Sequence, residues 1–151
     1  MMIIVRLAVG WNAVSAQNYI CNLLAPADVA PLLGAAQAGR PAANGATCVW
    51  GDMTAVDGKV GLTIQAPAVR AMAEAAFKAN RDRAVTNSPA QTKDEPGIGD
   101  RAFSQLTSQG AQFAVLKSGR LLQLQYSTSK RGTDADLTAL RGVAKKAVAA
   151  F

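Results

Sequence analysis

Residues 113–127 read FAVLKSGRLLQLQYS, two runs of alternating apolar side chains joined by Ser118-Gly119. Alternation over this length is typical of β-strands with one buried face, and a Ser-Gly pair between two such runs predicts a tight turn. In the second run the alternate leucines and the tyrosine share one face, whereas Gln123 and Gln125 lie on the other face, which we expect to be wetter. The stretch therefore predicts an antiparallel hairpin with one buried face.

A second hairpin is expected earlier in the chain, around an Asp-Gly turn at 57–58. Cys48 and Trp50 point to one side of the strand before this turn, and apolar residues alternate after it at 60–64. A further short strand is expected near 101–106. Together these segments predict an antiparallel sheet of about five strands.

Helical patterns lie at 25–34, 67–84 and 134–151. The second of these presents an apolar stripe made of Val69, Met72, Ala73, Ala76 and Phe77. Before the third, Thr133 followed by Asp136 forms a variant capping box that predicts a helix start. Strands followed and flanked by helices in this order predict an α+β domain, its sheet covered by two to three helices.

The segments 35–45 and 85–96 are expected to be loops, because the first is rich in Ala, Gly and Pro and the second is polar with two prolines. The second loop would place Asp94 and Glu95 in solvent. The two loops are expected to frame a ligand groove, with four candidate residues: Trp50, Asp100, Arg101 and Lys117. A tryptophan beside a cysteine is also an ordinary core residue, and that interpretation of Trp50 stays open.

The beginning of the chain, residues 1–16, resembles the end of a secretory signal peptide. Val14-Ser15-Ala16 has the small residues that signal peptidase requires, but the apolar run before it is short and is interrupted by Arg6. The alternative is an additional β-strand. The run is too short to cross a bilayer, so no transmembrane span is expected. We predict a single domain over 17–151, located in the periplasm or outside the cell.

The composition limits the partners and the chemistry. Sixteen Lys and Arg against ten Asp and Glu give a net charge of +6, but no basic run is longer than a pair. Nucleic-acid binders concentrate such charge on one face, so nucleic acid is not an expected partner. The chain has no histidine, and it therefore lacks the commonest general base and the commonest zinc ligand. We expect no catalytic residues, no cofactor and no metal.

The chain has two cysteines, Cys21 and Cys48. An even number of cysteines in an exported protein favours a disulfide, and two buried reduced thiols are the alternative. A catalytic thiol lacks a histidine to activate it, and two cysteines alone do not complete a tetrahedral metal site.

Several motifs occur together: CNLL at 21–24, APADVAPLLG at 25–34, TCVW at 47–50, GIGDRAF at 97–103 and an alanine-rich last helix. The chain resembles a broad group of bacterial exported proteins and lipoproteins of unassigned reaction. In that group C-x-L-L-T-x-x-D/E-V, C-x-W/Y and G-L-G-D-x-A-F recur in this order. The resemblance implies export, a Cys21–Cys48 disulfide and an α+β sandwich similar to the photosystem extrinsic-subunit and Mog1 fold. Ala25, in place of the usual Thr or Ser, and Pro31 depart from the pattern and weaken the first helix.

These observations favour a non-enzymatic binding or interaction domain of the cell envelope. Its partner would be an envelope component, a small molecule or another protein. Two alternatives remain. An enzyme of unfamiliar type would gather Asp100, Arg101 and Lys117 around a deep cleft. A basic nucleic-acid-binding protein would present a continuous basic face.

Overall fold

The computed structural model describes residues 16–42, 45–67 and 70–151. The signal-peptide or strand prediction for residues 1–16 falls, except for its last residue, outside the described residues, and so does Val69 of the predicted apolar stripe. The described part of the chain contains no helix with the length and apolar character needed to cross a membrane.

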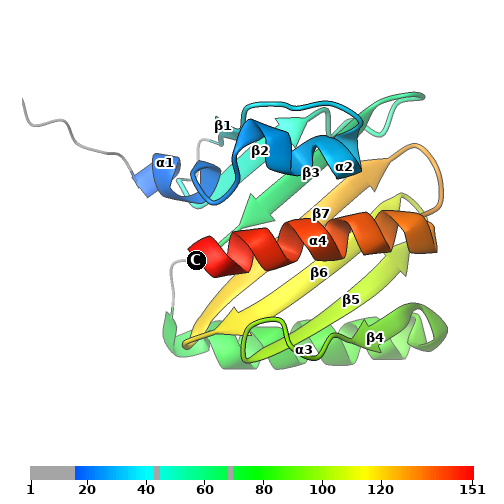
Figure 1. Cartoon of the computed structure of the whole chain (residues 1–151). Helices are drawn as coiled ribbons and strands as arrows, with labels where there is room; N and C mark the ends of the chain where they lie inside the picture. The colour runs from blue at the N-terminus through cyan, green and yellow to red at the C-terminus, as the bar shows by residue number, and fades with distance from the viewer. Residues whose placement is uncertain (1–15, 43–44, 68–69) are drawn as a thin grey trace, which may run out of the picture.

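One antiparallel sheet organises the described residues (Figure 1), and its strands lie in the order β1-β2-β3-β7-β6-β5-β4. The strands are β1 (Arg40–Pro41), β2 (Thr47–Gly51), β3 (Val60–Gln65), β4 (Thr92–Asp94), β5 (Arg101–Thr107), β6 (Gly110–Lys117) and β7 (Arg120–Thr128). The α+β class and the antiparallel sheet are confirmed, but the expectation of about five strands is wrong, because the sheet has seven. The two additional strands, β1 and β4, are its edges and lie in segments predicted to be loops. Strands of two or three residues are too short to show an alternating pattern.

The hairpin of β6 and β7 forms as predicted. Lys117 pairs with Arg120 across a turn in which Ser118 and Gly119 have φ of 50° and 72°. Positive φ at both central residues is the type I′ geometry, whose twist matches that of the flanking strands. The carboxylate of Asp100 accepts a hydrogen bond from the backbone N–H of Ser118 at 2.7 Å and so holds this turn.

Four α-helices lie in the described residues: α1 (Ala16–Cys21), α2 (Ala30–Leu33), α3 (Ala73–Asn87) and α4 (Asp134–Ala150). Three 3₁₀ helices precede or follow them: η1 (Pro26–Val29), η2 (Arg70–Met72) and η3 (Pro89–Gln91). In Figure 1, α2 and α4 lie side by side across one face of the sheet, and α3 runs along the opposite side of the molecule. The sheet therefore lies between two helical layers.

The helix ends follow the predicted chemistry in two cases. Thr133 Oγ1 accepts a hydrogen bond from the backbone N–H of Asp136 at 3.2 Å, and the Asp136 carboxylate accepts one from the Thr133 N–H at 2.9 Å. The first predicted helix is present as η1 followed by α2 and ends at Gly34, whose φ is 81°. The helix predicted over 67–84 is displaced: α3 begins at Ala73 and continues to Asn87, into the expected loop.

The main core lies between the sheet and α4. From the strands it takes Trp50, Leu62, Ile64, Phe113, Val115, Leu122 and Leu124, and from α4 it takes Leu137, Leu140, Val143, Ala144, Ala147 and Val148. The ion pair between Lys146 Nζ and Asp28 Oδ1, at 3.0 Å, joins α4 to η1 at the rim of this core. Burial of these side chains supplies the principal stabilisation of the domain.

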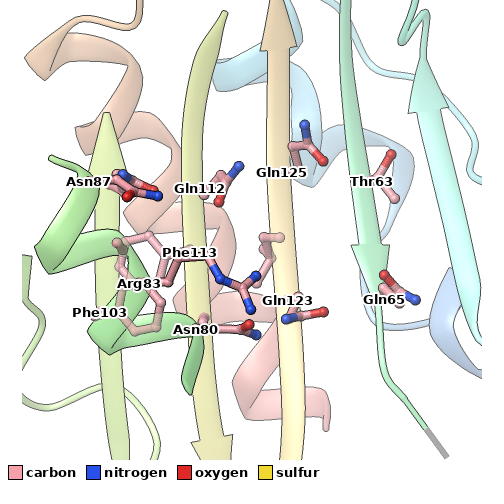
Figure 2. Close-up of a pocket in the computed structure, with 14 residues that line it drawn as sticks. Thr63, Gln65, Asn80, Arg83, Asn87, Phe103, Gln112, Phe113, Gln123 and Gln125 are labelled. Atoms are coloured by element: carbon pink, nitrogen blue, oxygen red, sulfur yellow. The ribbon is translucent and has the colours of Figure 1, made fainter. Parts of the chain in front are cut away.

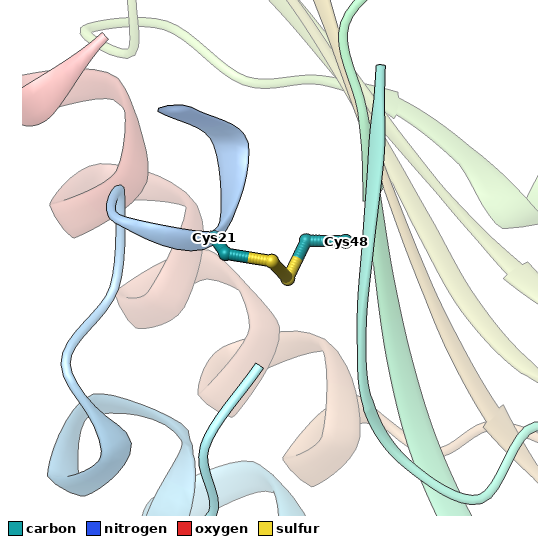
Figure 3. The surroundings of a disulfide bond; sticks show 2 residues. All are labelled: Cys21 and Cys48. Atoms are coloured by element: carbon teal, nitrogen blue, oxygen red, sulfur yellow. A yellow bond between two sulfur atoms is a disulfide. The ribbon is translucent and has the colours of Figure 1, made fainter. Parts of the chain in front are cut away.

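A disulfide joins Cys21 of α1 to Cys48 of β2, with their Cα atoms 5.2 Å apart (Figure 3). It confirms the pairing and excludes two reduced thiols. The backbone of Gly39 packs directly against it: a Cβ at that position would lie 2.6 Å from Cys48 Sγ and 2.7 Å from Trp50 Cε2. Trp50 itself is fully buried. The disulfide thus lies in a dense part of the core, where it secures α1 to β2, the strand next to the β1 edge of the sheet.

A buried polar cluster lies on the same side of the sheet. Glu95 is 8% exposed, although the sequence pattern placed it in a solvated loop. Its carboxylate accepts hydrogen bonds from Arg141 of α4 at 2.8 and 2.9 Å and from Ser104 of β5 at 2.7 Å. The bonds from Arg141, opposed by burial and assisted by Ser104, lower the pKa of Glu95 below its ordinary value of 4.5. The cluster ties α4 to the β4 edge of the sheet.

We expect Glu95→Gln to lower the free energy of unfolding by about 1 kcal/mol, since the charged hydrogen bonds weaken but Arg141 keeps partial contact with solvent. Because the folded-state pKa is depressed, the carboxylate stabilises the fold fully above pH 4.5 and loses that contribution as the pH falls through the folded-state value. Urea unfolding of both proteins between about pH 6 and pH 3 measures the difference. A difference that stays constant down to the lowest pH would contradict this role.

Candidate functional site

The helix α3 covers only part of the second face of the sheet. Beneath it lies a small apolar cluster made of Ala73, Phe77, Ala84, Phe103, Ala114, Leu116 and Leu121. The Phe77 and Phe103 rings meet edge to face, with centroids 5.5 Å apart. Beyond this cluster the same face of β3, β5, β6 and β7 carries polar side chains. The alternation of the strands produces this difference, since their apolar residues are used by the main core on the other face.

Four of the polar side chains form one row across the sheet. Thr63 pairs with Gln125, Gln125 with Gln112 and Gln112 with Gln105, so each of the four neighbouring strands contributes one residue. Adjacent strands in a sheet are about 4.8 Å apart, and the row therefore presents a polar group at that interval. Gln65 and Gln123, which also pair with each other, stand two positions further along β3 and two positions back along β7.

The helix supplies the facing wall. Asn80, Arg83 and Asn87 are three and four residues apart on α3 and therefore share one face of it. Between helix and sheet lies a groove of about 420 Å³, within the size range of small-molecule sites. Figure 2 shows the polar side chains converging on it from both walls. We call it the amide groove, and its lining polar residues are Thr63, Gln65, Asn80, Arg83, Asn87, Gln105, Gln112, Gln123 and Gln125.

The amide groove offers hydrogen bonds and one charge. Glutamine and asparagine each present donors and an acceptor without carrying charge. Among the described residues, the side chains that line the groove form no hydrogen bonds or ion pairs with other protein groups. Of the described residues that line the groove, Arg83 is the one that carries a charge. Phe103 lies under α3 but is 4% exposed, and the Phe113 ring belongs to the main core on the other face of the sheet, so neither ring is available for stacking on a ligand.

The four residues that the sequence predicted to form a groove do not lie together, and each makes a different contact within the protein. Trp50 is fully buried in the main core. Asp100 holds the β6–β7 turn, and Lys117 Nζ donates a hydrogen bond to the Val148 carbonyl of α4 at 2.6 Å. The Arg101 guanidinium lies 5.0 Å from the centroid of the Phe77 ring. None of the four lines the amide groove.

The sequence pattern found only part of the amide groove. It placed Gln123 and Gln125 on the wetter face of their strand, and both line the groove. It missed Asn80, Arg83 and Asn87 because their helical spacing is also that of an ordinary solvated face. Only the packing of α3 over this part of the sheet makes the two polar faces a single site.

Among the described residues, no group of three or more acidic or cysteine side chains is arranged to hold a metal ion. No family of known proteins, no curated protein and no solved structure matches the chain. The likeness to the photosystem extrinsic-subunit and Mog1 sandwich, and to the group of exported proteins, therefore remains a prediction from the motifs.

Proposed function

We propose that this protein is an exported, non-enzymatic binding domain of the bacterial cell envelope and that it holds its ligand in the amide groove. The observation that carries the proposal is the set of converging side-chain amides, which the fold leaves without partners. Polar groups aimed into a concave space and unused by the protein are typical of ligand sites. The motif resemblance supports export, and so does the disulfide, because such bonds persist in oxidising compartments.

Binding is favoured over catalysis by the residue types in the groove. Among the described residues, its lining contains no carboxylate, thiol or lysine, and the one hydroxyl, that of Thr63, has no such group beside it in the groove to take its proton. A nucleic-acid surface is disfavoured because the basic residues are scattered along the sequence in runs no longer than a pair. Among the described residues, Lys78, Arg81, Arg141 and Lys146 are each paired with an acidic side chain, which weakens the positive field at those positions.

The test of the groove is a nuclear magnetic resonance screen on ¹⁵N-labelled protein with small polar compounds. The side-chain NH₂ signals of Gln105, Gln112, Gln123 and Gln125 are expected to shift with a ligand, while those of Asn22 and Gln109, outside the groove, stay in place. If the shifts from every binding compound map elsewhere, the amide groove is not the site.

A matched pair of variants checks the location independently. Gln112→Trp places a large ring in the groove from an exposed position and is expected to weaken binding by about tenfold or more, the equivalent of one good contact. Gln109→Trp, on the exposed β5–β6 turn, is expected to leave binding unchanged. Equal affinity of the two variants would remove the groove from the proposal.

Export is tested by cell fractionation combined with thiol labelling. The protein is expressed in bacterial cells from its own gene, and the envelope and cytoplasmic fractions are denatured and treated with a maleimide. We expect the protein in the envelope fraction, unlabelled until a reductant is added, because its two sulfurs are bonded to each other. Recovery in the cytoplasm with two reactive thiols would contradict export.

A further inference from the structure

We infer that the ligand of the amide groove carries one carboxylate, which Arg83 binds, and that a neutral hydrogen-bonding portion of the ligand lies along the row from Thr63 to Gln105. The inference rests on the proposed function and specifies its ligand. It follows from the charge, the geometry and the surface chemistry of the groove.

The charge of the groove sets the charge of the ligand. The neighbouring cations of α3 are neutralised: Arg81 pairs with Asp94 at 2.7 Å and Lys78 with Asp82 at 2.6 Å. Arg83 has no acidic partner among the described residues and is left as one positive charge beside the groove. One such charge balances a carboxylate, whereas a phosphate monoester carries about −1.5 to −2 near pH 7.

The geometry of Arg83 favours the same group. A guanidinium presents two parallel N–H donors that match the two oxygens of a carboxylate. In Figure 2 the Arg83 side chain extends from α3 across the sheet toward Gln123, so that an anion held by it lies beside the glutamines of the groove. A cationic ligand is disfavoured, because none of the described residues that line the groove offers a negative charge to it and Arg83 would repel it.

The row of polar side chains selects the neutral portion. A ligand lying across the strands meets Thr63, Gln125, Gln112 and Gln105 in turn, at intervals of about 4.8 Å. Each glutamine can both donate and accept, which suits peptide groups and sugar hydroxyls equally. The shared chemistry is therefore a carboxylate beside a run of neutral polar groups, as at the end of a short peptide or in an acidic sugar.

The experiment compares carboxylates with their uncharged amides. Acetyl-triglycine and acetyl-triglycine amide form one pair, D-glucuronate and D-glucuronamide the other, and inorganic phosphate is the fifth probe. Each is titrated into ¹⁵N-labelled protein while the groove signals are followed. In the pair that matches the natural source, the carboxylate is expected to bind about tenfold or more tightly than the amide. The peptide pair and the sugar pair thus distinguish the two sources.

Substitutions assign the preference to Arg83. Arg83→Gln is expected to abolish the difference between carboxylate and amide, and Arg83→Lys, which keeps the charge but not the paired donors, to retain part of it. Arg70→Gln removes the same charge from an exposed position outside the groove and is expected to leave the difference intact. A persistent difference in Arg83→Gln, or its loss in Arg70→Gln, would overturn the assignment.

The remaining outcomes separate this inference from the proposed function. Equal binding of carboxylate and amide at the groove signals overturns the carboxylate while the groove remains a binding site. Phosphate binding through Arg83 more tightly than either carboxylate overturns the single-charge argument. If no probe shifts the groove signals, the inference fails, and the wider screen of polar compounds decides the proposed function separately.

Discussion

Replacing both cysteines, Cys21→Ala with Cys48→Ala, is expected to lower the free energy of unfolding by about 3.5 kcal/mol. The two residues are 27 positions apart, and opening that loop restores chain entropy to the unfolded state. The loop contains η1, α2 and β1, so loss of the bond also removes a covalent link that holds this segment against β2. Urea unfolding of the variant and the wild type at neutral pH measures the difference. The free energy of unfolding of each protein is extrapolated to zero urea with its own m value.

The wild-type protein in reductant is the control. Cys48 is fully buried beside Trp50 and Gly39, and truncation to alanine therefore adds a small cavity to the loss of the bond. Reduction removes the bond without the cavity, and we expect it to account for most of the decrease. If reduced and oxidised wild type unfold at the same urea concentration, the disulfide does not hold the N-terminal helices.

The second large effect is expected from Phe77→Ala, which should cost about 3–5 kcal/mol and abolish binding in the amide groove. Phe77 is fully buried and is the one large apolar side chain by which α3 contacts the sheet cluster, since the other buried residues of the helix are Ala73 and Ala84. Without the Phe77 ring, α3 loses its aromatic contact with Phe103 and most of its apolar packing on the sheet. The wall that carries Arg83 then no longer faces the row of glutamines.

Hydrogen exchange distinguishes release of α3 from general unfolding. Amides of α3 are expected to exchange faster in Phe77→Ala, while those of α4, which packs on the other face, keep their relative protection. Val85→Ala, at a 38% exposed position of the same helix, is the matched control and should change stability by less than about 0.5 kcal/mol. Uniform loss of protection across α3 and α4 would mean that α3 is not a separate unit.

Local patterns predicted several elements correctly. The β6–β7 hairpin, the Thr133 cap of α4 and the bonded cysteines all agree with the structure. Each depends on neighbours in the sequence or, for the cysteines, on a choice between very few partners. A turn that needs positive φ or a helix end that needs a side-chain oxygen leaves a signature within a few residues.

The elements that the sequence patterns predicted wrongly depend instead on residues far away in the sequence. The edge strand β4 and the buried carboxylate of Glu95 both lie in a stretch whose polar composition predicted a loop. That stretch is ordered by partners far away: β4 pairs with β5, and Glu95 is held by Arg141, which lies 46 positions later. A polar side chain can be buried when such a partner compensates its desolvation, and composition does not reveal the partner.

The amide groove shows the same division. The sequence by itself determined that Gln123 and Gln125 would lie opposite the buried leucines, because successive side chains of a strand point to opposite faces. Only the tertiary structure decided that α3 would lie over part of that face and bring Arg83 to the glutamines. It also placed Asp100 and Lys117 in hydrogen bonds with the β6–β7 turn and with α4, outside the amide groove. Local alternation fixes which face of an element is apolar, whereas long-range packing decides which elements meet.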